Sequence, residues 1–353
     1  MKCVSLFTGC GGLDIGLEKA GFRVVFANDL DATCEESYRL NKGAKAAFYR
    51  GSISDISLKL MREMSSGEVD KGIDLLAGGP PCPPYSKSRF YRKEKPRAID
   101  DPVGDETLNG YLKVLKVLKP KAFLFENVHG FAYKVHKEAF DLLCSTAGKL
   151  GYECSHRVIN AADYGVPQIR QRFFMVGVLG KKFQFPEPTH KKPEDGELFT
   201  NGMLPWRTAG DVITDLDTEE NADDTGHFAG GKHHDLLCQV PPGENYLFFT
   251  KERGHPDPQF KWRSRYWSFL LKLSPKMPSW TIQARRSNNM GPLHWRNRIL
   301  RIEEVKRLQT FPDDWQLAGT VERQWRQVGN AVPPLLGEVL GKEIKTQLRK
   351  TKK

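Results

Sequence analysis

Short apolar runs and amphipathic stretches alternate through the first half of the chain. The runs at 3–7, 22–29, 73–77 and 122–125 have the length of buried strands. Between them, apolar residues recur at helical spacing, as they do over 108–118. Buried strands that alternate with helices predict an α/β fold with a mostly parallel, doubly wound sheet.

The pattern changes in the second half. From about 186 to 296 the chain is rich in proline, glycine, histidine and aromatic residues, and no period is sustained. This composition predicts a smaller, irregular domain rather than more of the sheet. We therefore expect a large domain at 1–188 and 326–353, a small domain at 189–297, and a connecting segment at 298–325.

The charge of the chain favours a polyanionic partner. Lysine and arginine number 54 against 43 aspartate and glutamate residues, which gives a net charge of +11 over 353 residues. Such a balance is typical of nucleic-acid-binding proteins, but many basic proteins bind no nucleic acid.

The cysteines and histidines indicate neither disulfides nor a metal. The seven cysteines contain no Cys-x-x-Cys pair, so we expect a reducing, intracellular setting. His227, His233 and His234 do not form a ligand set with acids or thiols, so no metal is expected. No apolar run has the length of a membrane span, and glycines interrupt the N-terminal run before it could form a signal peptide.

A proline-rich loop follows the strand predicted at 73–77. Residues 78–86 place one thiol, Cys82, among four prolines and two glycines. Such a stiff loop continues neither a helix nor a central strand. A thiol fixed at the end of a parallel strand is well placed to be a nucleophile. Alternatively, Cys82 is a small buried residue in a tight turn, and the loop alone does not decide between the two.

A glycine turn joins the first strand to the first helix. Strand, glycine turn and helix form the opening of a nucleotide-binding unit, in which the Phe7 ring could face an adenine. The next strand ends on Asp29, at the position where Rossmann-like folds bind ribose hydroxyls. Asp29 could instead be the N-cap of a helix at 32–40.

Six motifs resemble those of the cytosine-5 DNA methyltransferase family, in the family's order and across almost the whole chain. They are Phe7 to Gly12, Gly79 to Cys82, Glu126 to Val128, Gln168 to Arg172, Arg307 to Pro312, and Gln327 to Pro333. The resemblance implies a Rossmann-like methyltransferase fold with a target-recognition domain. It also implies methyl transfer from S-adenosylmethionine to carbon-5 of a flipped-out cytosine in a specific duplex DNA sequence, with S-adenosylhomocysteine as product and without a metal.

The resemblance assigns catalytic roles to four residues. Cytosine carbon-5 is a poor nucleophile, and addition of a thiolate at carbon-6 activates it; Cys82 would be that covalent catalyst. Glu126 would act as the acid at ring nitrogen 3, with a raised pKa if the site is dry. Arg170 suits the carbonyl oxygen of the base or the region of the thiolate, and Arg172 is expected to brace the site.

The cofactor contacts implied by the resemblance lie on the glycine turn, the strand ends and the last motif. They are Phe7, Thr8, Gly9, Cys10, Gly11, Gly12, Leu13, Asp29, Leu30, Ser52, Ile53, Gly79, Pro80, Leu108, Asn330, Ala331 and Val332. Two features depart from the family pattern. Pro83, Pro84 and Tyr85 follow the nucleophile, and Ser52 stands where the family has an aspartate on the adenine amino group, so either Ser52 or Asp55 would take that role.

Two regions carry the predicted DNA contacts. The basic, aromatic segment 87–107 would be a mobile loop that clamps the phosphate backbone, although it could be only a solvated charge run. In the small domain, arginines suit base edges and lysines suit phosphates. The predicted DNA contacts are Ser86, Lys87, Arg89, Arg253, Lys261, Arg263, Arg285 and Arg286.

The chain resembles the compact prokaryotic members of the family, which serve restriction and modification. We accordingly expect a monomer in the cytoplasm that associates with the nucleoid, binds no membrane, and could have a cognate restriction endonuclease as partner. Two alternatives stay open: a tRNA cytosine-5 methyltransferase of the same fold, and a catalytically idle DNA-binding module. A mere binder would need neither Cys82 nor Glu126.

Overall fold

The computed structural model describes residues 1–44, 46–81, 101–193, 202–218 and 225–350. Four predicted site residues lie outside these ranges: Cys82, Ser86, Lys87 and Arg89.

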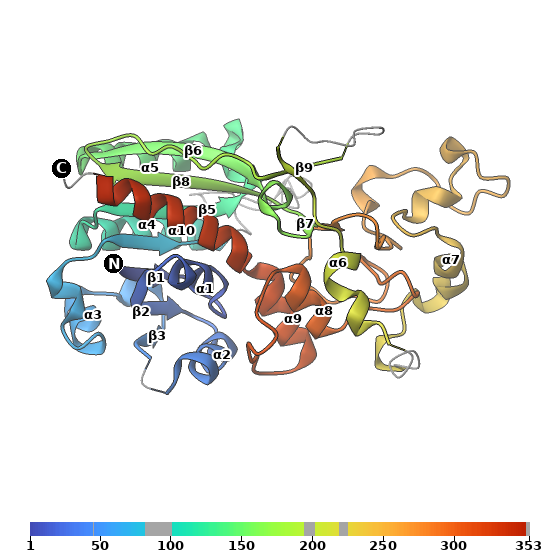
Figure 1. Ribbon diagram of the computed structural model, residues 1–353, viewed down its shortest axis with the longest axis horizontal. Coiled ribbons are helices and arrows are strands. Elements are labelled where there is room, and N and C mark those ends of the chain that lie inside the picture. Colours follow the sequence, from blue (N-terminus) through green and yellow to red (C-terminus); the bar gives the residue numbers. More distant parts are fainter. Residues whose placement is uncertain (45, 82–100, 194–201, 219–224, 351–353) are drawn as a thin grey trace.

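A seven-stranded sheet forms the larger body, with the strand order β3-β2-β1-β4-β5-β8-β6 (Figure 1). Strands β1 to β5 are parallel, and β8 runs antiparallel to both of its neighbours, β5 and β6. The prediction of a mostly parallel α/β sheet is confirmed. The strands are β1 (Lys2–Leu6), β2 (Arg23–Asp29), β3 (Phe48–Arg50), β4 (Leu75–Gly78), β5 (Ala122–Val128), β6 (Tyr152–Asn160) and β8 (Gln171–Leu179).

Helices cover both faces of the sheet. One face packs against α1 (Gly12–Lys19) and α10 (Pro334–Arg349), so the last helix of the chain lies on the sheet of the large body. Gly16 allows the two helices to approach, because a Cβ there would lie 2.2 Å from the Pro334 carbonyl oxygen. The other face is covered by α3 (Leu58–Met64), α4 (Pro102–Leu118) and α5 (Lys137–Lys149).

The N-terminus of α2 (Ala32–Lys42) settles one alternative from the sequence. The side chain of Asp31 accepts a hydrogen bond from the Thr33 amide at 2.9 Å, so Asp31 is the N-cap of this helix. The interpretation of Asp29 as the N-cap is therefore wrong. Asp29 remains the last residue of β2.

The smaller body is irregular, as its composition predicts, and lies beside the end of the sheet in Figure 1. One hydrophobic core joins Leu237, Leu270, Leu308 and Trp325, and it also takes in Cys10 of the large body. Helices α8 (Ile302–Leu308) and α9 (Val321–Asn330) thus pack with the small body, while the boundaries at 189, 298 and 326 stay a prediction. The elements here are β7 (Gln168–Ile169), β9 (His190–Lys191), β10 (Leu204–Pro205), α6 (Gly210–Ile213), α7 (His234–Gln239), β11 (Ser279–Trp280), α8 (Ile302–Leu308) and α9 (Val321–Asn330).

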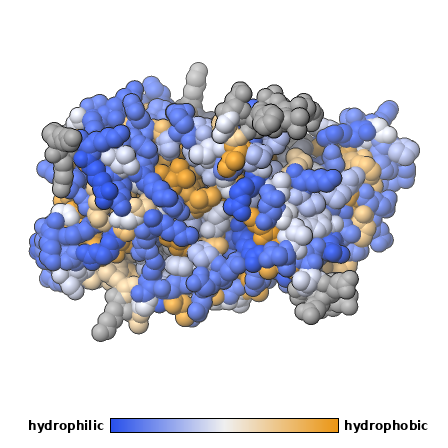
Figure 2. All heavy atoms as spheres, viewed as in Figure 1, coloured by the Kyte–Doolittle hydropathy of each residue, from blue (hydrophilic) through white to orange (hydrophobic). Residues whose placement is uncertain are grey.

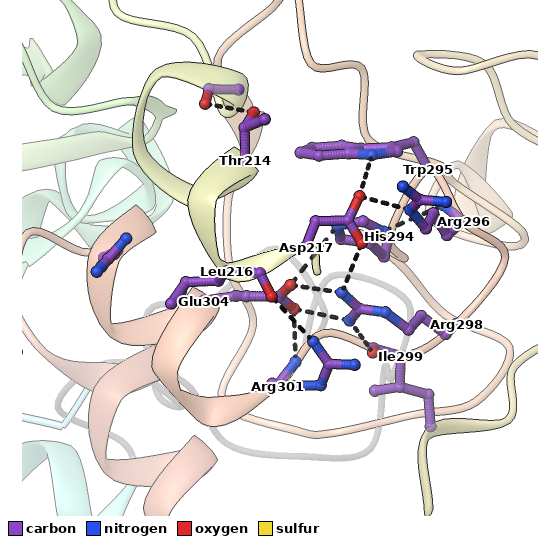
Figure 3. A network of polar contacts seen from close by, with 12 residues as sticks. Thr214, Leu216, Asp217, His294, Trp295, Arg296, Arg298, Ile299, Arg301 and Glu304 are labelled. Atoms are coloured by element: carbon purple, nitrogen blue, oxygen red, sulfur yellow. Dashed lines mark hydrogen bonds and ion pairs between the residues drawn. The ribbon is translucent and has the colours of Figure 1, made fainter. Parts of the chain in front are cut away.

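A buried polar network fixes α8 to the small body (Figure 3). Both guanidinium nitrogens of Arg298 donate to Glu304, at 2.9 and 2.6 Å, and Arg298 also lies 3.6 Å from Asp217. Burial and the adjacent Arg298 lower the pKa of His294 to about 3, so this ring is neutral. The charges are therefore paired where water cannot reach them.

The surface seen in Figure 2 is largely hydrophilic, and its apolar residues gather toward the middle rather than at the two ends. No helix in the described part of the chain is long and apolar enough to cross a membrane.

Candidate active site

The carboxyl ends of three parallel strands meet at one edge of the sheet. Leu6 of β1 pairs with Gly78 of β4, which pairs with Phe125 of β5. The strand order changes direction between β1 and β4, and this is where open α/β sheets bind ligands. The structure therefore brings together the glycine turn, the start of the proline-rich loop and the residue after Phe125, which is Glu126.

The carboxyl group of Glu126 is enclosed by protein atoms. Its Oε2 lies so close to Gly79 that a Cβ there would approach it to 2.7 Å, so the loop needs a glycine at this point. Asn127 ties the same loop to β5 by donating to the Pro80 carbonyl oxygen at 3.3 Å. Burial raises the pKa of Glu126, and the charges of Arg172 and Arg170 oppose that shift. A carboxyl group of this kind can hold a proton, as the predicted acid requires.

Arg172 is the arginine that contacts Glu126. Its Nε lies 3.3 Å from Glu126 Oε1, and the side chains are only 15% and 13% exposed. Arg172 stands at the start of β8, opposite Val128 of β5. The antiparallel pairing of these strands thus sets a cation beside the acid.

Arg170 connects several parts of the backbone. Its side chain is buried, and its guanidinium donates to the carbonyl oxygens of Ile282 at 3.1 Å, Gly329 at 2.8 Å and Ala331 at 3.0 Å. These acceptors lie in the small body and in the last motif. These donors on its two terminal nitrogens are directed to the backbone of the protein itself, and the role of Arg170 at the base stays a prediction.

The glycine turn and Asp29 form the opposite side of this sheet edge. The Gly9 amide donates to Asp29 Oδ2 at 2.8 Å, and the Asp31 amide donates to Oδ1 at 2.9 Å. Burial raises the pKa of Asp29, and these backbone donors oppose the shift. Phe7 and Gly9 both have a left-handed φ, of 54° and 57°.

This side has room for a nucleoside. No other atom lies within 4 Å of where a Cβ on Gly9 would be, and the Leu30 side chain is 72% exposed. The open glycine turn leaves room for the ligand, and the Asp29 carboxylate fits the hydroxyl groups of a ribose. The exposed side chain of Leu30 fits one face of an adenine ring. The described residues therefore fit S-adenosylmethionine.

Several predicted cofactor residues are held in packing instead. The Cys10 side chain lies in the core of the small body, and its carbonyl oxygen accepts from Trp315 Nε1 at 3.1 Å. A Cβ on Gly12 would lie 2.6 Å from the Val332 carbonyl oxygen, so these two segments touch. Leu13, Ile53 and Leu108 are buried as well, and Ala331 is half-buried, whereas Leu30 and Asn330 are exposed. A Cβ on Gly11 would lie 3.1 Å from the ring of Trp315.

Ser52 and Asp55, the alternatives for the adenine amino group, both have protein partners. The Ser52 hydroxyl donates to Glu106, which also accepts from the Ser54 hydroxyl at 3.0 Å. The partner of Asp55 is Tyr49. Burial and a hydrogen bond to the Asp55 carboxylate raise the pKa of the Tyr49 hydroxyl. Glu106, on α4, is a carboxylate at this edge that the sequence analysis missed, because no local signal links it to Ser52.

Asp14 is a second residue that the sequence analysis missed. It is fully buried and accepts from the hydroxyl groups of Ser5 and Thr8, each at 2.5 Å, and of Tyr38 at 3.1 Å. Burial raises its pKa to about 6, although the hydroxyl donors oppose the shift. Asp14 thus holds together β1, the glycine turn and α2. An acid in the first turn of a helix, between Leu13 and Ile15, was the available signal.

The predicted DNA contacts of the small body divide into two kinds. Lys261, Arg263 and Arg285 are exposed, as is Arg253 at 3.9 Å from Glu244. Arg286 is half-buried and donates to the Gly226 carbonyl oxygen at 2.7 Å. Arg286 also lies 3.4 Å from Glu322. The two arginines line a cavity of about 430 Å³ with Phe228, Ser287 and Asn288. Of the two, Arg285 is the one with donors available to a ligand.

The sheet order, the antiparallel β8 and the glycine turn beside Asp29 define a Rossmann-like methyltransferase fold. Solved structures agree. An E. coli prophage protein described as a DNA modification methyltransferase superposes with a TM-score of 0.72 at 20% identity, over 99% of each chain. The Dnmt2 methyltransferase of S. pombe gives 0.63 at 18% identity, over 100% of this chain and 99% of its own.

The chain belongs to the C-5 cytosine-specific DNA methylase family, whose model matches residues 1–346. The type II methyltransferase M.SacI of Streptomyces achromogenes is 36% identical over 99% of this chain and 93% of its own. M.FnuDI of Fusobacterium nucleatum is 32% identical over 99% and 95%. The protein is thus a DNA (cytosine-5-)-methyltransferase of the restriction-modification type, and a member of an S-adenosylmethionine-dependent family. The prediction from the six motifs is confirmed.

Proposed function

We propose that Cys82, Glu126 and Arg172 carry out the chemistry at the target cytosine, in a cleft between the large body and the small body. The observation that supports this most strongly is the position of Glu126, enclosed at the carboxyl edge beside Gly79 and paired with Arg172. This edge is where the proline-rich loop that carries Cys82 begins.

The thiolate of Cys82 adds to carbon-6 of the extruded base and forms a covalent bond. As charge builds on the ring, Glu126 donates its proton to nitrogen 3, and carbon-5 becomes nucleophilic. Bound S-adenosylmethionine supplies the methyl group. Arg172 keeps the Glu126 carboxyl oriented and limits how far its pKa rises. Water then accepts the carbon-5 proton, Cys82 departs as its thiolate, and nitrogen 3 returns its proton to Glu126 as the product is released.

The cofactor is held by the side of the edge opposite Glu126. Asp29 accepts from the ribose hydroxyls, Leu30 covers one face of the adenine, and the backbone of Gly9 faces the rest of the molecule. Asp14 supports this arrangement without touching the ligand, because its hydroxyl partners include Thr8 of the same turn. The product is S-adenosylhomocysteine, and no metal takes part.

Duplex DNA lies across the cleft and is read by the small body, where Arg285 is our first choice for a base contact. The net charge of +11 supports binding to the phosphate backbone. We also propose a monomer that acts in the cytoplasm of a prokaryote, with a cognate restriction endonuclease as its functional partner.

A duplex with 5-fluorocytosine at the target tests the covalent step. Fluorine is not eliminated as a proton is, so the protein should remain bonded to the DNA through Cys82 when S-adenosylmethionine is present. Cys82→Ser is the matched control; it should bind DNA but form no adduct and no methylated product. Turnover of Cys82→Ser within about tenfold of wild type would refute the mechanism. An absence of adduct where ordinary DNA is methylated would do the same.

A further inference from the structure

A thiol and an imidazole lie together on α7, at the end of the molecule farthest from the sheet in Figure 1. Cys238 Sγ is 3.5 Å from His234 Nε2, one helical turn away, and Cys238 is exposed to solvent. Neither residue takes part in the methyl transfer described above.

The hydrogen bond on the other side of the ring sets its tautomer. His234 Nδ1 lies 2.7 Å from the Ala229 carbonyl oxygen. A carbonyl oxygen only accepts, so Nδ1 carries the hydrogen and donates it. The lone pair of Nε2 therefore faces the thiol of Cys238, which makes His234 a base placed to accept the thiol proton.

A buried cation accompanies this pair. Lys272 is only 2% exposed, and within the described residues its ammonium makes no hydrogen bond and no ion pair. Burial lowers the pKa of Lys272, and a negative charge at Cys238 would oppose that shift.

The buried cysteines have the opposite surroundings. Cys3, Cys10 and Cys34 are buried, and burial raises the pKa of each thiol, to about 12 for Cys10. These thiols remain protonated and enclosed. Cys238 is therefore set apart from them by its exposure and by the base beside it.

We propose that Cys238, together with His234, forms a thiol modification site that reacts with low-molecular-weight disulfides. The thiol proton passes to His234 Nε2, and the thiolate attacks one sulfur of the disulfide R–S–S–R. The bond between Cys238 and that sulfur forms as the original S–S bond breaks. The departing thiolate takes the proton from His234, so the disulfide is the only oxidant needed.

This site is connected to the segment proposed to read DNA. The His234 ring stacks on Phe228 with centroids 4.4 Å apart, and Phe228 lines the same cavity as Arg285. The Gly230 amide also donates to the Asn288 carbonyl oxygen at 2.6 Å. A bulky group on Cys238 displaces the His234 ring, so modification should also weaken sequence-specific DNA binding. This second effect rests on the proposed function, whereas the reactivity of Cys238 does not.

The reactivity is measured on the full chain in a Cys82→Ser background, so that the proposed nucleophile does not contribute. With an excess of an aromatic disulfide such as 5,5′-dithiobis(2-nitrobenzoate), one thiol should react in a fast phase that is absent in Cys238→Ser. His234→Gln should slow that phase by about tenfold at pH 7. It should not slow the phase near pH 9.5, where thiols ionise without help.

His233→Gln is the matched control, because that ring packs on Phe260 and Phe269 instead of approaching the thiol. It should leave the fast phase unchanged. A fast phase that persists in Cys238→Ser would overturn the proposal. A reaction rate of Cys238 that is the same in His234→Gln as in the parent protein would overturn it as well. Cys238 and His234 both lie on the short helix α7, so Cys238→Ser and His234→Gln test the site without disrupting the hydrophobic core. Oxidised glutathione, followed by mass spectrometry, should give one adduct that a reducing thiol removes.

Discussion

Arg172 Nε lies 3.3 Å from Glu126 Oε1, across the antiparallel pair of β8 and β5, and both side chains are largely shielded from water. Burial alone would favour the neutral carboxyl group, and the cation opposes it. The pair therefore holds Glu126 as an acid whose pKa is raised, but less than burial would raise it. This balance is what an acid working near neutral pH requires.

Removal of the cation should shift the pH dependence of turnover. In Arg172→Gln the pKa of Glu126 rises further, so the alkaline limb of kcat, where the acid loses its proton, should move to higher pH. Arg172→Lys keeps a charge and should move the limb less. The measurement is kcat from pH 6 to 10 at saturating DNA and cofactor. An alkaline limb that stays in place in Arg172→Gln would show that Glu126 is not the titrating acid.

Glu126→Gln should lower kcat by about 10² to 10⁴, the usual contribution of a positioned acid. It should leave the dissociation constant for DNA nearly unchanged. Single-turnover methylation and a binding titration on the same duplex separate the two quantities. If the dissociation constant rose as much as kcat fell, Glu126 would be needed to bind the base rather than to protonate it.

Arg170→Met should instead destabilise the fold. It removes donors from three carbonyl oxygens that link the last motif and the small body to the sheet. We expect the free energy of unfolding to fall by about 2 to 5 kcal/mol. Arg253→Met is the control, since its side chain is exposed and lies 3.9 Å from Glu244, and it should change stability by less than about 0.5 kcal/mol. Urea unfolding measures both, and equal stabilities would contradict this role for Arg170.

Arg170 and Arg172 illustrate which features of the site could not be predicted from the sequence. Strands, glycine turns and the acid at the end of β5 have local signals, so the sheet and the positions of Asp29 and Glu126 were predictable. Arg170 and Arg172 share one motif, and only the tertiary contacts of the first and the register of β8 against β5 separate their roles. Asp14 was missed for the same reason, because its three partners come from different elements. The role of Cys82 stays a prediction.

Asp14 should make the folded state more stable at low pH than at neutral pH. Its pKa is about 6 in the folded protein, against an ordinary value of 3.8. A raised pKa means that its contribution is fully present below pH 3.8 and is lost as the pH rises through 6. The free energy of unfolding of wild type relative to Asp14→Asn should thus decrease between pH 4 and 6.5, by at most about 3 kcal/mol.

Asp74 is a control of opposite sign for that experiment. Burial opposes the shift, but Lys121 and the Lys2 amide, at 2.5 and 2.7 Å, lower its pKa. The stability that Asp74 contributes should therefore be lost as the pH falls, and Asp74→Asn should differ most from wild type at neutral pH.

Asp14→Asn should also raise KM for S-adenosylmethionine more than KM for DNA. A flat difference between wild type and Asp14→Asn from pH 4 to 6.5 would show that this carboxyl does not titrate as described.

Arg285, Arg286 and Lys261 should give three distinct results. Arg285 is exposed, and within the described residues it makes no hydrogen bond, so Arg285→Ala should cost about 1 to 3 kcal/mol at the cognate site and relax preference at one base pair. Arg286 is anchored to Gly226, so Arg286→Ala should lower stability and weaken all binding in proportion. Lys261→Ala should weaken binding to every duplex alike and reduce the salt dependence.

Binding and methylation across single-base variants of the site, at several salt concentrations, separate these three results. A base contact differs from a phosphate contact in its geometry. A base edge is recognised by hydrogen-bond donors in a fixed position, whereas a phosphate needs only a nearby positive charge. Unfolding measured on each variant shows whether Arg286→Ala acts through the fold. If Arg285→Ala reduced binding equally at every site variant, Arg285 would be a phosphate contact. Base recognition would then have to be sought elsewhere in the small body or in the segment that carries Lys87 and Arg89.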